Sequence, residues 1–320
     1  MARFYNWSLV IFLILISDNC YGVNILSWWG YLSEKEIKEI ESKCLTKVYY
    51  DEYYSNDEFL RRVRKDNYSI IIFSSVVYNF VNDLIKDQKI SLSSLKNRYN
   101  HNILKEFKKK NFPNNVGIFS LSYTGFLYNS KEFNIESNDS VEDIFRKAEG
   151  KVVSILDDPI ESLNLLDNLN IKKETNSVVN NFNNLLKNKT VYITNYNDKL
   201  VNKKNFAFSF SWMGEALYRI NKFNKENEYK FYIHPKMNYL SIDLISAIQN
   251  DKKTKCVINT LLDKDFLNSI LSNKYYISPY SNLIDLGFKN SGFDWIKIPD
   301  KNEYNLKSNI WQRIKISLKN

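Results

Sequence analysis

Two acidic side chains near the middle of the chain have a spacing that could do chemistry. Residues 151–156 form a β-branched run that predicts a buried strand, and the run ends at the sequence Asp157-Asp158-Pro159-Ile160-Glu161. Asp158 holds the N-cap position of the helix predicted to follow, and Glu161 holds its third position. Alone, this motif favours a capping box. Because α/β sheets bind ligands at the carboxyl ends of their strands, the two carboxylates can also pair with a cation.

Other kinds of chemistry find little support in the sequence. The chain has two histidines, His101 and His234, and neither belongs to a zinc or nucleophile motif. Its 8 glycines form no phosphate-binding loop, so we expect no nucleotide, metal or other cofactor. The formal net charge is +9, but the lysines are scattered and their clusters are short. They predict solvated faces and no nucleic-acid partner.

The first residues predict export from the cytoplasm. Residues 9–16 are an unbroken apolar run, and Cys20-Tyr21-Gly22 follows with residues of the kind that signal peptidase recognises. The run is shorter than the ~20 residues needed to span a bilayer. We therefore predict a cleaved signal peptide over residues 1–22, a mature chain that begins near Val23, and a periplasmic location. Lipoprotein anchoring through Cys20 is the second interpretation, because the preceding residues make a poor lipobox.

Two cysteines would remain after cleavage. Cys44 and Cys256 lie far apart in the sequence and lack metal-ligand spacing. In an exported protein they can form one disulfide, and two separate thiols are equally compatible with the sequence.

The order of the predicted elements indicates an α/β fold. At 320 residues and 44% hydrophobic, the chain is long enough to bury a sizeable core. Apolar strands at residues 24–27, 48–50 and 68–73 alternate with helices, the first two of which begin at capping boxes. This βαβαβ order predicts a parallel sheet covered on both faces. A strand-like stretch at residues 116–129 then crosses to a second lobe, and a strand at residues 239–243 leads back.

The sequence therefore predicts two lobes joined by crossing strands, because it has no internal repeat and no flexible linker. We assign residues 23–124 and 244–294 to the first lobe, and residues 125–243 and 295–320 to the second. Aromatic, hydroxyl or acidic residues follow strand after strand, namely Trp28, Tyr31, Ser74, Asp158, Glu161, Trp212 and Asp243. Each of them has a core or capping alternative. Together they predict the lining of one cleft between the lobes.

The same pieces resemble the periplasmic polyamine-binding proteins of ABC importers, the spermidine/putrescine-binding family. The resemblance covers most of residues 24–280 at low identity, and it rests on the order and spacing of short motifs. These motifs are Ser27-Trp28-Trp29-Gly30-Tyr31, the tyrosine-rich run of residues 48–58, the strand that ends at Ser74, Asp157-Asp158 with Glu161, Trp212-Met213-Gly214, and Asp243.

The resemblance implies a type II periplasmic binding protein that captures a polyamine and delivers it to an ABC permease, without catalysing a reaction. Trp28, Tyr31 and Trp212 would contact the ligand's methylene chain and ammonium groups. Asp158, Glu161 and Asp243 would pair with its amines, Ser74 would donate or accept a hydrogen bond, and Tyr276 matches a late tyrosine of the family. Carboxylates separated by flat aromatic faces suit a string of cations joined by apolar linkers.

Three departures from the family pattern leave the ligand open. Gly30 stands where family members often carry an acid, Val76 stands where an aromatic is common, and Ser241 stands where they carry a tryptophan. Another small cation, such as ferric iron bound near the tyrosines of residues 49–54, is therefore an alternative. An enzyme that uses Asp158 and Glu161 as acid and base is less favoured, because the two share one helix end instead of flanking a substrate. A structural protein of the cell envelope is the third class.

Overall fold

The computed structural model describes residues 22–86, 90–166, 175–196, 200, 203–237, 239–282 and 294–318. The predicted signal peptide, residues 1–22, lies outside the described residues apart from Gly22.

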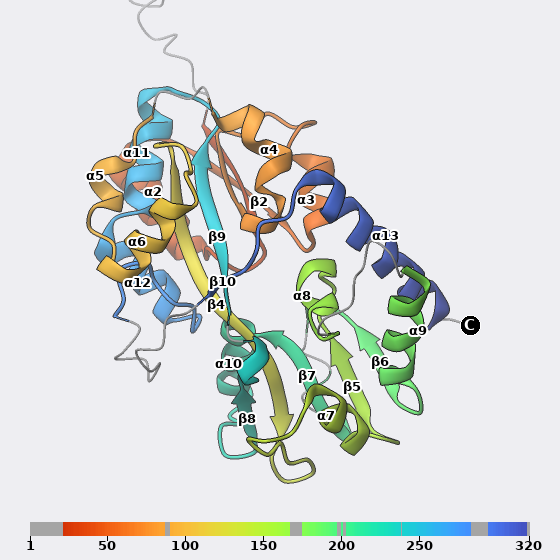
Figure 1. The fold of residues 1–320 in the computed structure, drawn as a ribbon. Helices are drawn as coiled ribbons and strands as arrows, with labels where there is room; N and C mark the ends of the chain where they lie inside the picture. Colours follow the sequence, from red (N-terminus) through yellow and green to blue (C-terminus); the bar gives the residue numbers. More distant parts are fainter. Residues whose placement is uncertain are drawn as a thin grey trace, which may run out of the picture.

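One continuous sheet runs through the molecule in the strand order β2-β1-β3-β9-β4-β7-β5-β6 (Figure 1). Its strands are β1 (Val23–Trp28), β2 (Val48–Tyr53), β3 (Ile70–Ser74), β4 (Val116–Asn129), β5 (Val152–Ile155), β6 (Thr190–Ile193), β7 (Phe206–Trp212), β8 (Tyr229–Tyr232), β9 (Tyr239–Ala247) and β10 (Asp294–Trp295). The last pairs with β9, and β8 pairs with β4. The predicted α/β class is therefore confirmed.

The first lobe is the half of this sheet that contains β1, β2, β3 and β9. The first three strands are parallel, and β9 lies antiparallel between β3 and β4. Its helices are α2 (Glu34–Cys44), α3 (Asn56–Arg62), α4 (Tyr78–Ile85), α5 (Ser93–Lys96), α6 (His101–Lys109), α11 (Lys252–Leu261) and α12 (Lys264–Ser272), with the 3-10 turn η1 (Ser75–Val77). Two separate hydrophobic clusters lie against its sheet, so both faces are covered as predicted.

The predicted capping box is present at the start of α2, whereas at the start of α3 only its Ser55 half forms and the Glu58 carboxylate accepts from the Tyr54 backbone N–H. The Ser33 backbone N–H donates to the Glu36 carboxylate at 2.5 Å, which opens α2. The Glu58 backbone N–H donates to Ser55 Oγ at 3.2 Å, which opens α3. These local bonds satisfy backbone donors that a helix start leaves unpaired, and so they place each helix directly after its strand.

The second lobe contains β5, β6, β7 and β8. The first two of these are parallel to each other and β5 is also parallel to β7, whereas β7 and β8 run antiparallel to β4. Its helices are α7 (Val141–Lys147), α8 (Pro159–Leu163), α9 (Thr175–Leu186), α10 (Met213–Lys222) and α13 (Lys301–Ser317), with the 3-10 turn η2 (Pro235–Met237). The C-terminal α13 packs on α8 and α9 (Figure 1).

The long strand β4 belongs to both lobes. Residues 116–123 of this 14-residue strand pair with β9, and residues 124–129 pair with β7 and β8. Figure 1 shows β4 running from the sheet of the first lobe into that of the second. The predicted crossing strand is therefore present, while the residue bounds assigned to the lobes stay a prediction.

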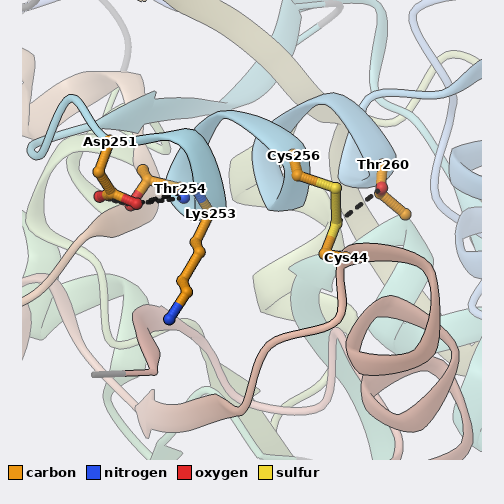
Figure 2. Close-up of a disulfide and its surroundings, with 6 residues drawn as sticks. All are labelled: Cys44, Asp251, Lys253, Thr254, Cys256 and Thr260. Carbon is orange, nitrogen blue, oxygen red and sulfur yellow. Dashed lines mark hydrogen bonds between the residues drawn. A yellow bond between two sulfur atoms is a disulfide. The ribbon is translucent and has the colours of Figure 1, made fainter. Parts of the chain in front are cut away.

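A disulfide joins two helices of the first lobe. Cys44, the last residue of α2, is bonded to Cys256 on α11, and their Cα atoms are 5.7 Å apart (Figure 2). The two residues are separated by 212 positions in sequence. The sequence left open whether these cysteines pair, and the structure shows that they do. The bond constrains a long loop of the unfolded chain, which is where disulfides gain most of their stabilising effect.

We expect that replacing both cysteines by serine lowers the free energy of unfolding by about 2–4 kcal/mol, because the unfolded chain regains that loop entropy. Urea denaturation of the wild type, with and without reductant, and of the double variant measures the effect. The double variant is the matched control, since reductant should leave its midpoint unchanged. Identical midpoints for the oxidised and reduced wild type would contradict the prediction.

Candidate functional site

A cavity of about 320 Å³ lies between the two lobes. Both lobes contribute to its wall. Seven of the eight site residues predicted from the sequence line it, namely Trp28, Tyr31, Ser74, Glu161, Trp212, Asp243 and Tyr276. The cleft lining that the strand ends predicted is therefore brought together in the structure, although the role of each residue in binding a ligand stays a prediction.

Strand register explains why these side chains meet. In the first lobe, Ser74 at the end of β3 is paired with Asp243 on β9. On the other side of β9, Asp243 faces Ser120 of β4. In the second lobe, Trp212 at the end of β7 is paired with Thr124 of β4. Residues of the two lobes therefore lie close together, because the single strand β4 pairs with β9 in the first lobe and with β7 in the second.

Glu161 is a buried carboxylate held by three donors. It is 3% exposed, and its Oε1 accepts from Trp212 Nε1 at 2.7 Å and from Ser241 Oγ at 2.8 Å. Thr124 Oγ1 donates to its other oxygen. Burial raises the pKa of Glu161, and the neighbouring Asp158 charge raises it further. Desolvation therefore outweighs the three hydrogen bonds, which by themselves lower this pKa.

Asp243 is the second carboxylate of the cavity. Its Oδ2 accepts hydrogen bonds from Tyr31 OH and from Ser120 Oγ, the latter at 3.1 Å. Burial raises the pKa of Asp243 to about 6, while these donors lower it. Tyr276 packs edge-on against Tyr31 with ring centroids 5.3 Å apart and so fixes the phenol that holds the carboxylate.

Asp158 does not line the cavity. Its Oδ1 accepts from the backbone N–H groups of Ile160 at 2.8 Å and Glu161 at 2.9 Å, so the predicted capping role is confirmed. Its Oδ2 accepts from Asn56 Nδ2 of the first lobe at 2.9 Å. Both oxygens are thus engaged within the protein, and Asp158 links the lobes. Its predicted pairing with a ligand amine stays a prediction.

Two tryptophans form apolar walls. Trp28 of the first lobe and Trp212 of the second approach edge-on, with ring centroids 5.4 Å apart and an interplanar angle of 67°. Trp28 also packs against Tyr53 at 4.6 Å. Such rings offer an apolar surface and an electron-rich face, and both suit an alkylammonium group.

Two acids and a row of hydroxyls line or support the cavity although the sequence did not assign them to the site. Asp157 and Glu215 line it, and both are paired with cations of the protein. Lys315 Nζ lies 3.0 Å from Asp157, and Arg219 Nε lies 2.7 Å from Glu215. The hydroxyls are Ser120, Ser122 and Thr124, at alternate positions of β4. Their alternation with apolar residues is a signal of one polar strand face that could have revealed them.

Further contacts close the cleft at the level of the strand ends. Asn195 Nδ2 of the second lobe donates to the Tyr54 carbonyl of the first at 3.0 Å. The rings of Trp29 and Tyr196 lie 4.8 Å apart across the same gap. The Arg219 guanidinium lies over both rings, at 5.1 Å from Trp29 and 4.7 Å from Tyr196. The described lobes are thus in direct contact around the cavity.

In the part of the chain that the structure describes, no three His, Cys, Asp or Glu residues are grouped so that they could hold a metal ion. Among its helices, none combines the length and apolar character needed to cross a membrane.

Solved structures of substrate-binding proteins share this fold. A spermidine/putrescine ABC transporter substrate-binding protein from Streptococcus pneumoniae aligns over 92% of this chain and 98% of its own, with 16% identity and a TM-score of 0.67. A Treponema pallidum lipoprotein aligns over 92% and 99%, with 13% identity and a TM-score of 0.74. A periplasmic thiamin binding protein aligns over 91% and 95%, with 13% identity and a TM-score of 0.64.

No protein-family profile matches the chain, and no curated protein sequence matches it. At the identities above, the structural likeness shows the fold alone. That fold is the two-lobed architecture of periplasmic binding proteins, so the fold that the sequence resemblance implied is confirmed.

The raised pKa of Glu161 predicts an unusual dependence of stability on pH. Between the ordinary pKa of the unfolded chain and the raised pKa of the folded one, the native carboxyl binds a proton that the unfolded chain has released. Its contribution to stability is therefore present on the acid side and is lost as pH rises through the folded pKa. Glu161→Gln removes the ionisation. Without ligand, we expect this variant to gain about 1–3 kcal/mol relative to wild type between about pH 5 and pH 8.

Urea denaturation of both proteins across this pH range measures the difference. Glu226→Gln in the exposed turn after α10 serves as the control, because removing a solvated acid should add no such trend. A difference between Glu161→Gln and wild type that is constant with pH, or that shrinks as pH rises, would contradict the assignment of a buried ionisable carboxylate.

Proposed function

We propose that this protein is the extracytoplasmic substrate-binding component of an ABC importer, and that it captures a polyamine such as putrescine or spermidine in the interlobe cavity. One observation carries the proposal. Four acids line the cavity, of which Asp157 and Glu215 have a protein cation as partner. Within the described part of the chain, neither Glu161 nor Asp243 lies within ion-pair distance of a lysine or arginine.

The electrostatic argument starts from the cost of burying charge. A carboxylate removed from water loses solvation that neutral hydrogen-bond donors replace only in part. The raised pKa values of Glu161 and Asp243 express that cost. A ligand with two ammonium groups would neutralise both carboxylates, and it would supply cationic donors, which the described part of the chain does not give these two groups.

The apolar part of the cavity suits the rest of such a ligand. Trp28 and Trp212 form walls of the same cavity as the two carboxylates. A methylene linker can pack on these rings, while an ammonium next to a ring face gains a cation–π contact of about 0.5–2 kcal/mol. An arrangement of acids and aromatic faces is therefore complementary to amines separated by short hydrocarbon chains.

Two further observations support capture outside the cytoplasm and delivery to a permease. The Cys44–Cys256 disulfide is typical of an oxidising compartment, in agreement with the export signal predicted for residues 1–22. The shared strand β4 and its partner β9 provide a connection between the lobes, and we assign the hinge to them. Opening there would release the Asn56–Asp158 and Tyr54–Asn195 hydrogen bonds and expose the cavity.

The competing functions have less support in the geometry. Tyr49 and Tyr54 of the tyrosine-rich run are 55% and 52% exposed, and Tyr49 does not line the cavity, so the run does not assemble a ferric-iron site there. For catalysis by an acid–base pair, Asp158 would need a free oxygen in the cavity. Its two oxygens are instead engaged by backbone amides and by Asn56.

Isothermal titration calorimetry with putrescine and spermidine tests the proposal. We expect Glu161→Gln and Asp243→Asn each to weaken binding by about 100-fold or more, because each leaves a ligand ammonium buried without its counter-ion. Asp157→Asn is the matched control, since it lines the same cavity but is already compensated by Lys315. The affinity of this variant for either polyamine should fall by less than about tenfold. A folded wild type that releases no heat with either polyamine would overturn the proposal.

Binding should also weaken as pH falls. Amines of the ligand stay protonated, whereas Asp243 takes up a proton as pH approaches its pKa of about 6, and Glu161 does the same because its pKa is raised as well. A protonated carboxyl cannot pair with an ammonium, so the affinity should fall from about pH 8 to about pH 5. Affinity that is constant or rises over this range would show that the two carboxylates are not the counter-ions.

A further inference from the structure

A second, smaller compartment adjoins the cavity. It has a volume of about 100 Å³. Its lining residues are Trp29, Gly30, Tyr31, Glu215, Tyr218, Lys274 and Tyr276. Four of these, Trp29, Tyr31, Glu215 and Tyr276, also line the main cavity, so the two spaces share a wall. A ligand too long for the main cavity would extend in this direction.

Lys274, which follows α12, brings a positive charge to the second compartment. Its ammonium lies 6.0 Å from the centroid of the Tyr218 ring. Among the residues that the structure describes, none supplies a carboxylate within ion-pair distance of it, and the attraction of Glu36 and Glu52 acts from farther away. Burial lowers the pKa of Lys274, and those two acids raise it.

The other charged residues around the compartment make no ion pair with Lys274 in the described part of the chain. Glu215, the acid in its lining, is paired with the Arg219 guanidinium at 2.7 Å. Glu52 is adjacent: its Oε1 accepts from the backbone N–H of Gly30 at 2.7 Å, and its charge attracts Lys274 without an ion-pair contact in the described part of the chain. The main cavity thus holds two carboxylates without a protein cation, while the second compartment holds an ammonium without a close carboxylate. The second compartment thus presents a cation of the protein to any part of a ligand that extends into it from the main cavity.

We propose that Lys274 makes the second compartment a charge filter that limits the ligand to a diamine. This inference rests on the proposed function. The two ammonium groups of a diamine neutralise Glu161 and Asp243, and each acid that lines the main cavity then has a cationic partner. A third ammonium that enters the second compartment meets the like charge of Lys274 there. Lys274 is in this sense a specificity-determining residue for ligand length and charge.

The test compares putrescine, a diamine, with spermidine, a triamine, by titration calorimetry on the whole protein. We expect wild type to bind putrescine more tightly. Lys274→Gln should shift the ratio of the two dissociation constants toward spermidine by about tenfold or more, and Lys274→Glu should shift it further. Lys274→Arg keeps the charge and should keep the wild-type ratio. Lys108→Gln, which removes an exposed lysine of α6, should leave both affinities unchanged.

Several outcomes would overturn the filter and can be told apart from failure of the proposed function. Equal affinities in wild type, or a ratio that is the same in Lys274→Gln, would remove the filter while leaving polyamine capture intact. Tighter binding of ornithine than putrescine, lost in Lys274→Gln, would show instead that Lys274 receives a ligand carboxylate. No binding of either polyamine by folded wild type would overturn the function and the filter together. Circular dichroism of each variant establishes that it is folded.

Discussion

Removing the carboxylates of Glu161 and Asp243 from water is the constraint on which the rest of the cleft depends. The protein surrounds them with hydroxyl, phenol and indole donors, and not with lysine or arginine from the described chain. Neutral donors orient a carboxylate but bring no positive charge, so the pKa of each group stays raised. The cleft therefore keeps a negative charge that a cationic ligand can neutralise. Asp157 and Glu215, by contrast, are compensated by the protein itself.

The sheet supplies the positions that this arrangement needs. Alternate residues of β4 present Ser120, Ser122 and Thr124 on one face, and two of these hydroxyls bind the two carboxylates. Because β4 pairs with β9 in one lobe and with β7 in the other, acids from both lobes share one set of donors. Bringing the two lobes together therefore also assembles the lining of the cavity.

Local patterns in the sequence predicted the strand ends and helix caps well, because those features depend on neighbouring residues. The capping role of Asp158 is an example. What local patterns could not show is the partner of its second oxygen, Asn56, which is 102 positions away. For the same reason the position of Glu215 in the cavity was missed, and the pairing of Cys44 with Cys256 was left open. An acid in the first turn of a helix looks like a capping residue until tertiary structure brings it to a cavity, and two distant cysteines carry no pairing signal.

A crystal structure of the protein in complex with putrescine would show directly which side chains bind the two ligand nitrogens. We expect electron density for the diamine in the cavity that Trp28 and Trp212 line, with one nitrogen within hydrogen-bond distance of Glu161 and the other within that distance of Asp243. Density for the ligand outside this cavity, or an ammonium bound by Asp157 or Glu215 while Glu161 and Asp243 keep only their protein donors, would contradict this expectation.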